Sequence, residues 1–392
     1  MSDWATCAVL DSFTKTKIGR KYQILARDIA QTGEFPVVDQ GQEFIAGYYD
    51  DQEKLIDFDL PLVIFGDHTR CFKYVDFPFV LGADGTKVLV PNKDLYDPKF
   101  YYFALMALEV PSRGYNRHFK ILKERSLPLP PLPEQKKIAH ILSTVQRAVE
   151  AQERIIQTTT ELKKTLMHKL FTEGTRGDPQ KQTEIGPVPE SWEVVPLGDV
   201  LLIAQYGMSV KGNPEGHYPI LRMTNQINGQ IMANKLQFVE INAPDFQKFK
   251  VERGDILFNR TNSLELVGRT AIHDIDGDYV FASYLVRLRT DGTKLNPFFL
   301  NLHFNRDETQ VLLKSLATRA VSQSNISATR LKGFPIPLPR LPDQAEIVEC
   351  AAAFDAKIDL HRTKLAAFQE LFRTLLHELM TAKLSTYPLH LG

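Results

Sequence analysis

The chain has 392 residues, of which 43% are hydrophobic and 24% are charged, so it has room for two or three globular domains of ordinary composition. Lys and Arg together number 47, as do Asp and Glu, and this balance excludes nucleic-acid binding through bulk charge, leaving only local basic patches. The sequence shows no secretory signal, and its longest apolar run, residues 101–110, is too short to cross a bilayer. We therefore expect a cytoplasmic protein without membrane contact. Three scattered cysteines predict reduced thiols, not disulfides or zinc.

Residues 1–126 are predicted to form a first mixed α/β domain. Short β-branched and aromatic runs, such as LVIFG at 62–66, are separated by Gly, Asn and Asp, and a helix is expected after the last of them. Five basic residues and a single acid lie between residues 113 and 125. Such a cluster suits phosphate contacts, although a solvated basic helix end would have the same composition.

Residues 127–177 are predicted to form an extended strap and a long helix. The prolines of LPLPPLP fix φ and exclude helix. The Glu-Gln pair that follows places an acid at the positive end of a helix. Residues 134–172 contain neither Gly nor Pro, and an apolar stripe with heptad spacing runs from Ile138 to Leu170, which is typical of a coiled coil. Residues 173–190 read as a polar linker.

The second half of the chain repeats this order. Residues 178–335 are predicted to form a second α/β domain, and residues 336–392 a second strap and helix with a tail. GHYPIL at 216–221 resembles GEFPVV at 33–38 in the first domain. Residues 309–342 contain five basic residues and no acid, in the same position before the strap.

The strongest signal is an internal duplication. When the chain is shifted by 209 residues, residues 116–172 match residues 325–381 without a gap, with 17 identities in 57 positions. We expect the two helices to pair with each other as an antiparallel coiled coil, with the domains at opposite ends. Gln152 and His361 then fall near the middle, where two polar residues would set the register. The alternative is that both helices point to solvent.

The predicted fold class is α+β, with two α/β domains separated by two long helices in a pseudo-twofold repeat. Catalysis by the chain is not expected. NPFF at 296–299 lacks the second proline of an adenine methyltransferase loop, and HELM at 377–380 lacks the second His of a zincin. Neither a P-loop nor a convincing Ser/His/Asp arrangement is present, so we predict no catalytic residues and no metal site.

The straps, helices and variable domains resemble the specificity subunit of type I restriction-modification enzymes. PESWEVVPLGDV at 189–200 is similar to the opening of a target-recognition domain in that family, and GDILFNRTNS at 254–263 to a segment within it. SNISATRLKGFPIPLPRLPDQ at 324–344 is similar to its close, and FPVVDQGQEFIAGYYDD at 35–51 to a common variant. Two positions depart from the pattern, since Trp4 lacks the PxxW lead and Arg340 replaces the proline of the first strap.

The resemblance implies a DNA-reading subunit that has no catalysis of its own. In that family each recognition domain reads one part of a bipartite, asymmetric target in double-stranded DNA, and the paired helices hold the spacing. The expected partners are two methyltransferase subunits and two restriction subunits that act as motor-nucleases. No cofactor is expected in this chain; S-adenosylmethionine belongs with the methyltransferase, and ATP and Mg with the motor-nuclease. The alternative function is a coiled-coil interaction scaffold with two adaptor domains.

Base-edge and phosphate contacts are expected from basic and amide side chains in the loops. Arg suits guanine O6 and N7, and Asn or Gln suits adenine N6 and N7. His68 as a capped loop histidine, and Arg222 and Asn225 as strand-end residues, remain open alternatives. The predicted DNA-binding residues are His68, Thr69, Arg70, Arg113, Arg117, Lys120, Lys211, Arg222, Asn225, Arg260, Thr261, Asn262, Arg319, Gln323, Ser324 and Asn325.

Overall fold

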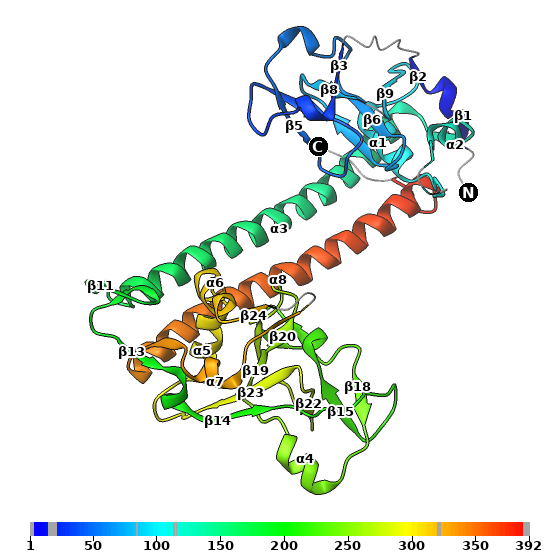
Figure 1. The fold of residues 1–392 in the computed structure, drawn as a ribbon. Helices are drawn as coiled ribbons and strands as arrows, with labels where there is room; N and C mark the ends of the chain where they lie inside the picture. The colour runs from blue at the N-terminus through cyan, green and yellow to red at the C-terminus, as the bar shows by residue number, and fades with distance from the viewer. Residues whose placement is uncertain are drawn as a thin grey trace. The chain divides into compact units, whose positions relative to one another are not determined.

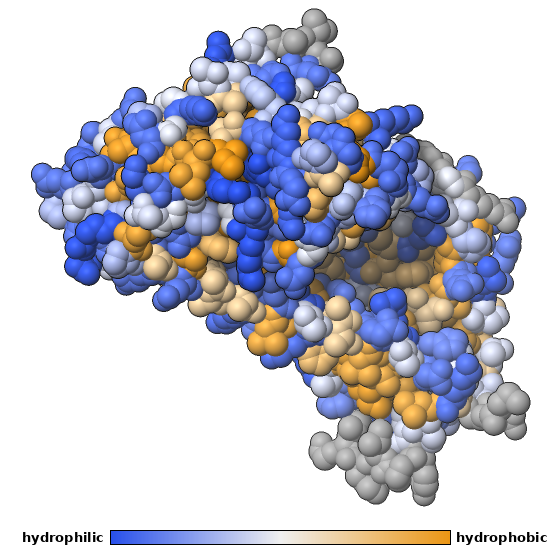
Figure 2. Space-filling view, turned by 90° about the horizontal axis from the view of Figure 1, so that it is seen from below, coloured by the Kyte–Doolittle hydropathy of each residue, from blue (hydrophilic) through white to orange (hydrophobic). Residues whose placement is uncertain are grey.

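The computed structural model describes residues 4–14, 22–83, 85–112, 114, 116–319 and 323–386, and it divides into two compact units (Figure 1). Unit 1 contains residues 1–155 and 361–392, and unit 2 contains residues 156–360. Each unit holds one α/β domain and half of each long helix, which confirms the expected fold class. Across the described residues, every helix is too short or too polar to span a bilayer. The face in Figure 2 is largely hydrophilic, with apolar side chains gathered in smaller patches.

The α/β domain of unit 1 is built on two small sheets. One has the strand order β2-β9-β6-β7 and the other β3-β8-β4-β5. Phe65 in β6 and Phe100 and Phe103 in α1 belong to the same buried apolar cluster, so the helix covers the first sheet. The elements are β2 (Phe13–Thr14), β3 (Gln23–Ile24), β4 (Phe35–Val38), β5 (Gly47–Tyr49), β6 (Leu62–Gly66), β7 (Phe72–Val75), β8 (Val80–Gly82), β9 (Thr86–Pro91) and α1 (Pro98–Met106).

The α/β domain of unit 2 is built on a six-stranded sheet of order β14-β23-β19-β21-β17-β16 and a three-stranded sheet of order β18-β15-β22. Phe258 in β19 and Phe299 in α5 lie in one buried cluster with Trp192. The elements are β14 (Leu201–Tyr206), β15 (Tyr218–Leu221), β16 (Gln226–Ile227), β17 (Gln230–Ile231), β18 (Gln237–Val239), α4 (Ala243–Phe249), β19 (Ile256–Asn259), β21 (Thr270–Ile272), β22 (Val280–Phe281), β23 (Leu285–Thr290), α5 (Pro297–Phe304) and α6 (Asp307–Ser315).

The duplication appears in the structure with the register that the sequence predicts. Three consecutive elements of the first half of the chain each begin 209 residues before an element of the same type in the second half. The pairs are α2 (Phe119–Lys123) with α7 (Ala328–Lys332), β10 (Ser126–Leu129) with β26 (Pro335–Leu338), and α3 (Leu132–Glu173) with α8 (Leu341–Met380). The first part of each strap is a strand. β10 pairs with β1 (Ala5–Ala8), and β26 pairs with β13 (Glu193–Pro196), both antiparallel.

A buried glutamine ties each strap to its own α/β domain. The Gln135 amide donates to the carbonyls of Leu95 and Pro130, both at 2.8 Å, and its oxygen accepts the Asp97 N–H at 2.8 Å. Gln344 makes the three equivalent hydrogen bonds in unit 2. Its amide donates to the carbonyls of Lys294 at 2.9 Å and Pro339 at 2.8 Å, and its oxygen accepts the Asn296 N–H at 2.7 Å. Neither glutamine is exposed to solvent.

The long helices run antiparallel within each unit. In unit 1, Ile138 and Leu142 near the start of α3 share a buried cluster with Leu379 and Met380 at the end of α8. In unit 2, Phe171 near the end of α3 shares a cluster with Ile347 near the start of α8. The predicted register residues lie within unit 1, where His361 Nδ1 is 2.7 Å from Gln152 Oε1.

Two local expectations differ from the structure. Both long helices begin two residues earlier than expected, at Leu132 and Leu341, and each includes a proline as its second residue. A proline is accepted there because the N–H groups of the first turn have no partner within the helix. The expected linker contains a hairpin of β11 (Gln180–Thr183) and β12 (Gly186–Pro189), since the hairpin satisfies backbone groups that a free linker would leave to water.

Candidate functional site

In unit 2, a three-stranded sheet brings together predicted DNA-binding residues that are about sixty positions apart in sequence. Its strands are β20 (Thr261–Asn262), β25 (Ser324–Asn325) and β24 (Thr318–Arg319), in the order β20-β25-β24. Thr261 lies opposite Asn325, and Asn262 lies opposite Ser324. Directly opposed side chains share one face of a sheet and successive ones alternate, so Thr261 and Asn325 lie on one face and Asn262 and Ser324 on the other. Ser324 is buried.

Arg260 enters this sheet with its backbone held on both sides. Its N–H donates to the carbonyl of Tyr284 at 3.0 Å, and its carbonyl accepts the N–H of Ile326 at 2.9 Å. Its guanidinium carbon lies 4.7 Å from the centre of the Tyr206 ring, which is a cation–π contact. The Nε of Arg260 and the hydroxyl of Thr261 are buried without a hydrogen-bond partner.

The other predicted residues near this sheet differ in exposure. Asn262 donates its amide to the sulfur of Met223 at 3.0 Å, whereas Gln323 is exposed. Lys211 is exposed and lines a cavity of about 390 Å³ together with Arg222. Arg319 lies in β24, and its side chain falls outside the described part of the structure.

The geometry gives Asn225 a structural role. Asn225 is fully buried in a 3-10 helix, η6 (Met223–Asn225), and its amide donates to the carbonyls of Met232 at 3.1 Å and Asn234 at 2.8 Å. Its oxygen accepts the N–H of Arg222 at 3.0 Å. The Arg222 guanidinium donates to the carbonyl of Lys235 at 3.0 Å, while its Nε is buried without a hydrogen-bond partner. The open alternative, a strand-end role, thus fits Asn225 better than base contact.

In unit 1, the corresponding residues lie in the turn after β6. The His68 N–H donates to Gln40 Oε1 at 3.1 Å. The Thr69 hydroxyl donates to the carbonyl of the same glutamine. Arg70 adopts a left-handed φ of 64° and donates from Nη1 to the carbonyl of Val110 at 2.9 Å. Part of the donor capacity of this turn is therefore used to hold its own shape.

The basic segment of unit 1 docks on that turn through Asp67. The Asp67 carboxylate accepts the N–H of Phe119 at 2.7 Å, and its backbone carbonyl accepts the N–H of His118 at 2.9 Å. Arg117 and Lys120 are exposed beside this contact. Arg113 lies outside the described residues.

The two units place these segments in the same position of the repeat. In unit 1 the chain leaving β6 is bonded to the segment before α2 by the carbonyl of Asp67, and in unit 2 the chain leaving β19 is bonded to the segment before α7 by the carbonyl of Arg260. Each unit thus joins the end of a central strand to its basic segment. The side chains that surround the junction differ between the units.

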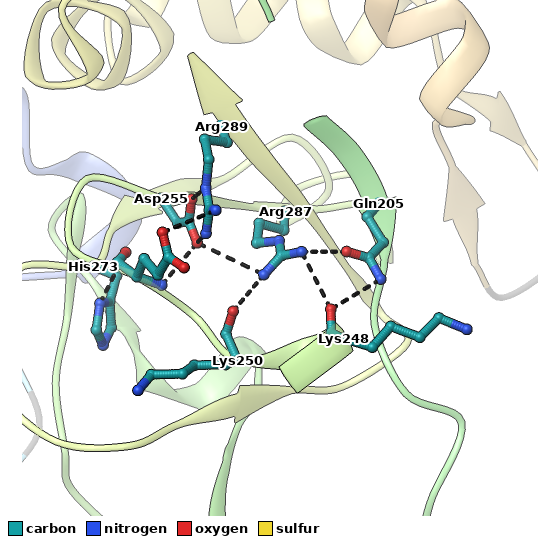
Figure 3. Close-up of polar contacts among 8 residues, drawn as sticks. Gln205, Lys248, Lys250, Asp255, His273, Arg287 and Arg289 are labelled. Carbon is teal, nitrogen blue, oxygen red and sulfur yellow. Dashed lines mark hydrogen bonds and ion pairs between the residues drawn. The ribbon is translucent and has the colours of Figure 1, made fainter. Parts of the chain in front are cut away.

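A second polar cluster in unit 2 was missed by sequence reasoning (Figure 3). Arg289 forms two parallel hydrogen bonds with the buried Asp255 carboxylate, at 2.7 and 2.8 Å. Arg287, 3.9 Å from the same carboxylate, also donates to the side chain of Gln205 and to the carbonyl of Lys250. No local pattern in the sequence links these positions. Because Arg287 in β23 donates to the carbonyls of Lys248 and Lys250 at the end of α4, this cluster joins α4 to the main sheet.

Burial and ion pairing shift the pKa values of this cluster in opposite directions. Burial lowers the pKa of Arg287, and Asp255 opposes that effect. The pKa of Arg289 is raised chiefly by its hydrogen bonds to Asp255. Burial also lowers the pKa of His273, whose Nδ1 lies 3.2 Å from the carbonyl of Glu252.

Comparisons with known proteins agree on one family. The family model described as the type I restriction modification DNA specificity domain matches residues 1–161 and 189–369. A protein of Methanocaldococcus jannaschii, named as the specificity subunit of the type I restriction enzyme MjaX, is 33% identical over 204 residues, which cover 51% of this chain and 48% of that protein. The specificity subunit of the type I restriction enzyme MjaVIII from the same organism is 28% identical over 276 residues, which cover 68% of this chain and 63% of that protein. The matched regions thus cover from about half to just under two thirds of the length of these relatives.

A solved structure shares the fold along nearly the whole chain. The S subunit of a type I restriction-modification system from M. genitalium aligns with a TM-score of 0.61 over 96% of each chain. The sequences are only 17% identical, so this likeness concerns the arrangement of the backbone.

Proposed function

Because the chain belongs to the family of type I restriction modification DNA specificity domains, we propose that it is the DNA-reading subunit of such a system. Each α/β domain is a recognition domain for one part of a bipartite, asymmetric target in double-stranded DNA. The helix pair fixes the helical phase between the two parts, as the spacing of half-sites does for dimeric DNA-binding proteins.

The observation that carries the proposal is the repeated junction between a central strand and a basic segment. Asp67 marks that junction in unit 1 and Arg260 marks it in unit 2. Exposed cations such as Lys120 and Lys211 suit phosphate contacts, and the half-buried Asn325 of the β20-β25-β24 sheet suits a base edge. Two different readers in one chain favour an asymmetric target.

In this proposal, partner subunits carry out methylation and DNA cleavage. Two methyltransferase subunits would carry S-adenosylmethionine and receive the flipped adenine, because a base cannot react inside the stack. Two motor-nuclease subunits would carry ATP and Mg²⁺. In this arrangement the chain itself is non-catalytic and acts in the cytoplasm.

Co-expression with the neighbouring methyltransferase, followed by mapping of N6-methyladenine across the host genome, tests the proposal. We expect one bipartite asymmetric motif. Charge removal at Lys120 or at Lys211 should lower the extent of methylation and leave the motif unchanged, because a phosphate contact carries no sequence information. If an intact complex supplied with S-adenosylmethionine adds no methylation, the chain is an interaction scaffold and not a reader.

A further inference from the structure

Arg260 is held more rigidly than a phosphate contact requires. Its backbone N–H and carbonyl are both bonded, to Tyr284 and Ile326. Its guanidinium carbon lies over the Tyr206 ring, 4.7 Å from the ring centre. A guanidinium held on an aromatic ring in this way loses little side-chain entropy on binding and still offers its terminal nitrogens for two parallel hydrogen bonds.

Within the described part of the chain, no carboxylate pairs with the Arg260 guanidinium. Its neighbours in the domain are different. Arg289 has both a buried and an exposed carboxylate, and the terminal nitrogens of Arg287 donate to Gln205 and to backbone carbonyls. Arg260 Nε is buried without an acceptor, so Nη1 and Nη2 are left as the donors that can meet a ligand.

Tyr206 is itself fixed in place. It is the last residue of β14, and its hydroxyl accepts the N–H of Ala328, the first residue of α7, at 2.9 Å. The side chain is 43% exposed, so the ring bridges the edge of the main sheet and the segment that bears β25 while it carries Arg260 at the surface.

We infer that Arg260 contacts a guanine in the major groove through its Nη1 and Nη2 groups, and that Tyr206 is the residue that positions it. This inference rests on the proposed function. An arginine fork matches guanine O6 and N7, the commonest specific contact in DNA recognition. A phosphate ligand needs only a charge, and the exposed Lys211 supplies one in the cavity that Tyr284, the backbone partner of Arg260, also lines.

The test uses the complex of the full chain with its methyltransferase and duplexes that contain its mapped target. In the half-site read by unit 2, each guanine is replaced in turn by 7-deazaguanine, which lacks only the N7 acceptor. We expect one position at which this replacement weakens binding about 10- to 100-fold. Arg260→Lys, which keeps the charge and loses the fork, should bind the natural duplex correspondingly less tightly and become insensitive to 7-deazaguanine at that position alone.

Tyr206 variants separate positioning from folding. Tyr206→Phe keeps the ring and should keep most of the guanine preference, whereas Tyr206→Leu should lose most of it with the other half-site read normally. The control is Arg253→Lys, because Arg253 is an exposed arginine paired with Asp274, and it should leave every duplex unaffected.

Other outcomes overturn the inference. If no guanine in this half-site responds to 7-deazaguanine, or if Arg260→Lys keeps the wild-type response, Arg260 does not read guanine. Equal weakening of all duplexes by Arg260→Ala, with Arg260→Lys close to wild type, would make it a phosphate contact. A wild-type complex without any sequence preference would instead overturn the proposed function.

Discussion

Replacing the buried strap glutamine of unit 2, Gln344→Met, should destabilise that unit without touching its DNA-facing residues. The side chain keeps its length and loses three hydrogen bonds, to Asn296, Lys294 and Pro339. Each is worth about 0.5–1.5 kcal/mol, so about 3 kcal/mol of the free energy of unfolding should be lost. For a unit of this size that is a fall of about 6–12 °C in Tm.

Amide hydrogen exchange measures this effect at its origin. The Asn296 N–H, which donates to the Gln344 oxygen, should exchange faster in the variant, together with the start of α5. The repeat offers a matched test, because Gln135→Met should act in the same way on Asp97 and unit 1. Gln157→Met is the control, since the side chain of this exposed residue donates to Glu161, one turn further along the same helix. A Gln344→Met protein that melts within about 1 °C of wild type would show that these three bonds do not hold the strap.

Three further predictions concern charge and register. Asp255→Asn should cost about 3–5 kcal/mol in urea unfolding, because two arginines lose a buried counter-ion, while Glu252→Gln at the exposed edge should cost under about 1 kcal/mol. Burial holds the pKa of His303 well below its usual value, so below about pH 6.5 only the unfolded state gains its proton. As the pH falls below that value, the free energy of unfolding should decrease by up to about 1.4 kcal/mol per pH unit, and His303→Phe should reduce that slope. An unchanged slope would mean that His303 takes up its proton in the folded state. Gln152→Leu should lower the melting temperature of the helices, whereas the exchanged pair, Gln152→His with His361→Gln, should melt close to wild type. If the two variants melt alike, the 2.7 Å contact has no part in register.

The sequence predicts the repeated features of the fold well because each depends on a local pattern that occurs in both halves of the chain. Prolines mark the straps, and the acid-Gln pairs mark the helix starts, in one register of 209 residues. The helix starts were misplaced only by two residues. Proline at the second helical position costs nothing there, so the pattern of Leu132 and Pro133 alone does not show whether the strap has ended.

The candidate site was predicted in part. The basic clusters and the Asn and Gln positions follow from composition, and the structure brings Thr261, Asn262, Ser324 and Asn325 into one sheet. The stacking of Arg260 on Tyr206 was not predicted, because it joins residues 54 positions apart whose types alone indicate nothing. The buried role of Asn225 depends equally on the loop that closes around it.

The two units also differ in when they can be completed during synthesis. Unit 2 is one continuous segment, whereas unit 1 needs residues 1–155 and then residues from 361 onward. Until α8 leaves the ribosome, Ile138 and Leu142 lack the partners Leu379 and Met380. At about 5–20 residues per second, the 205 residues of unit 2 take roughly 10–40 s to make. The unit that is translated first is thus the last to be completed, and its half of α3 exposes an apolar stripe to chaperones and to other nascent chains throughout that interval.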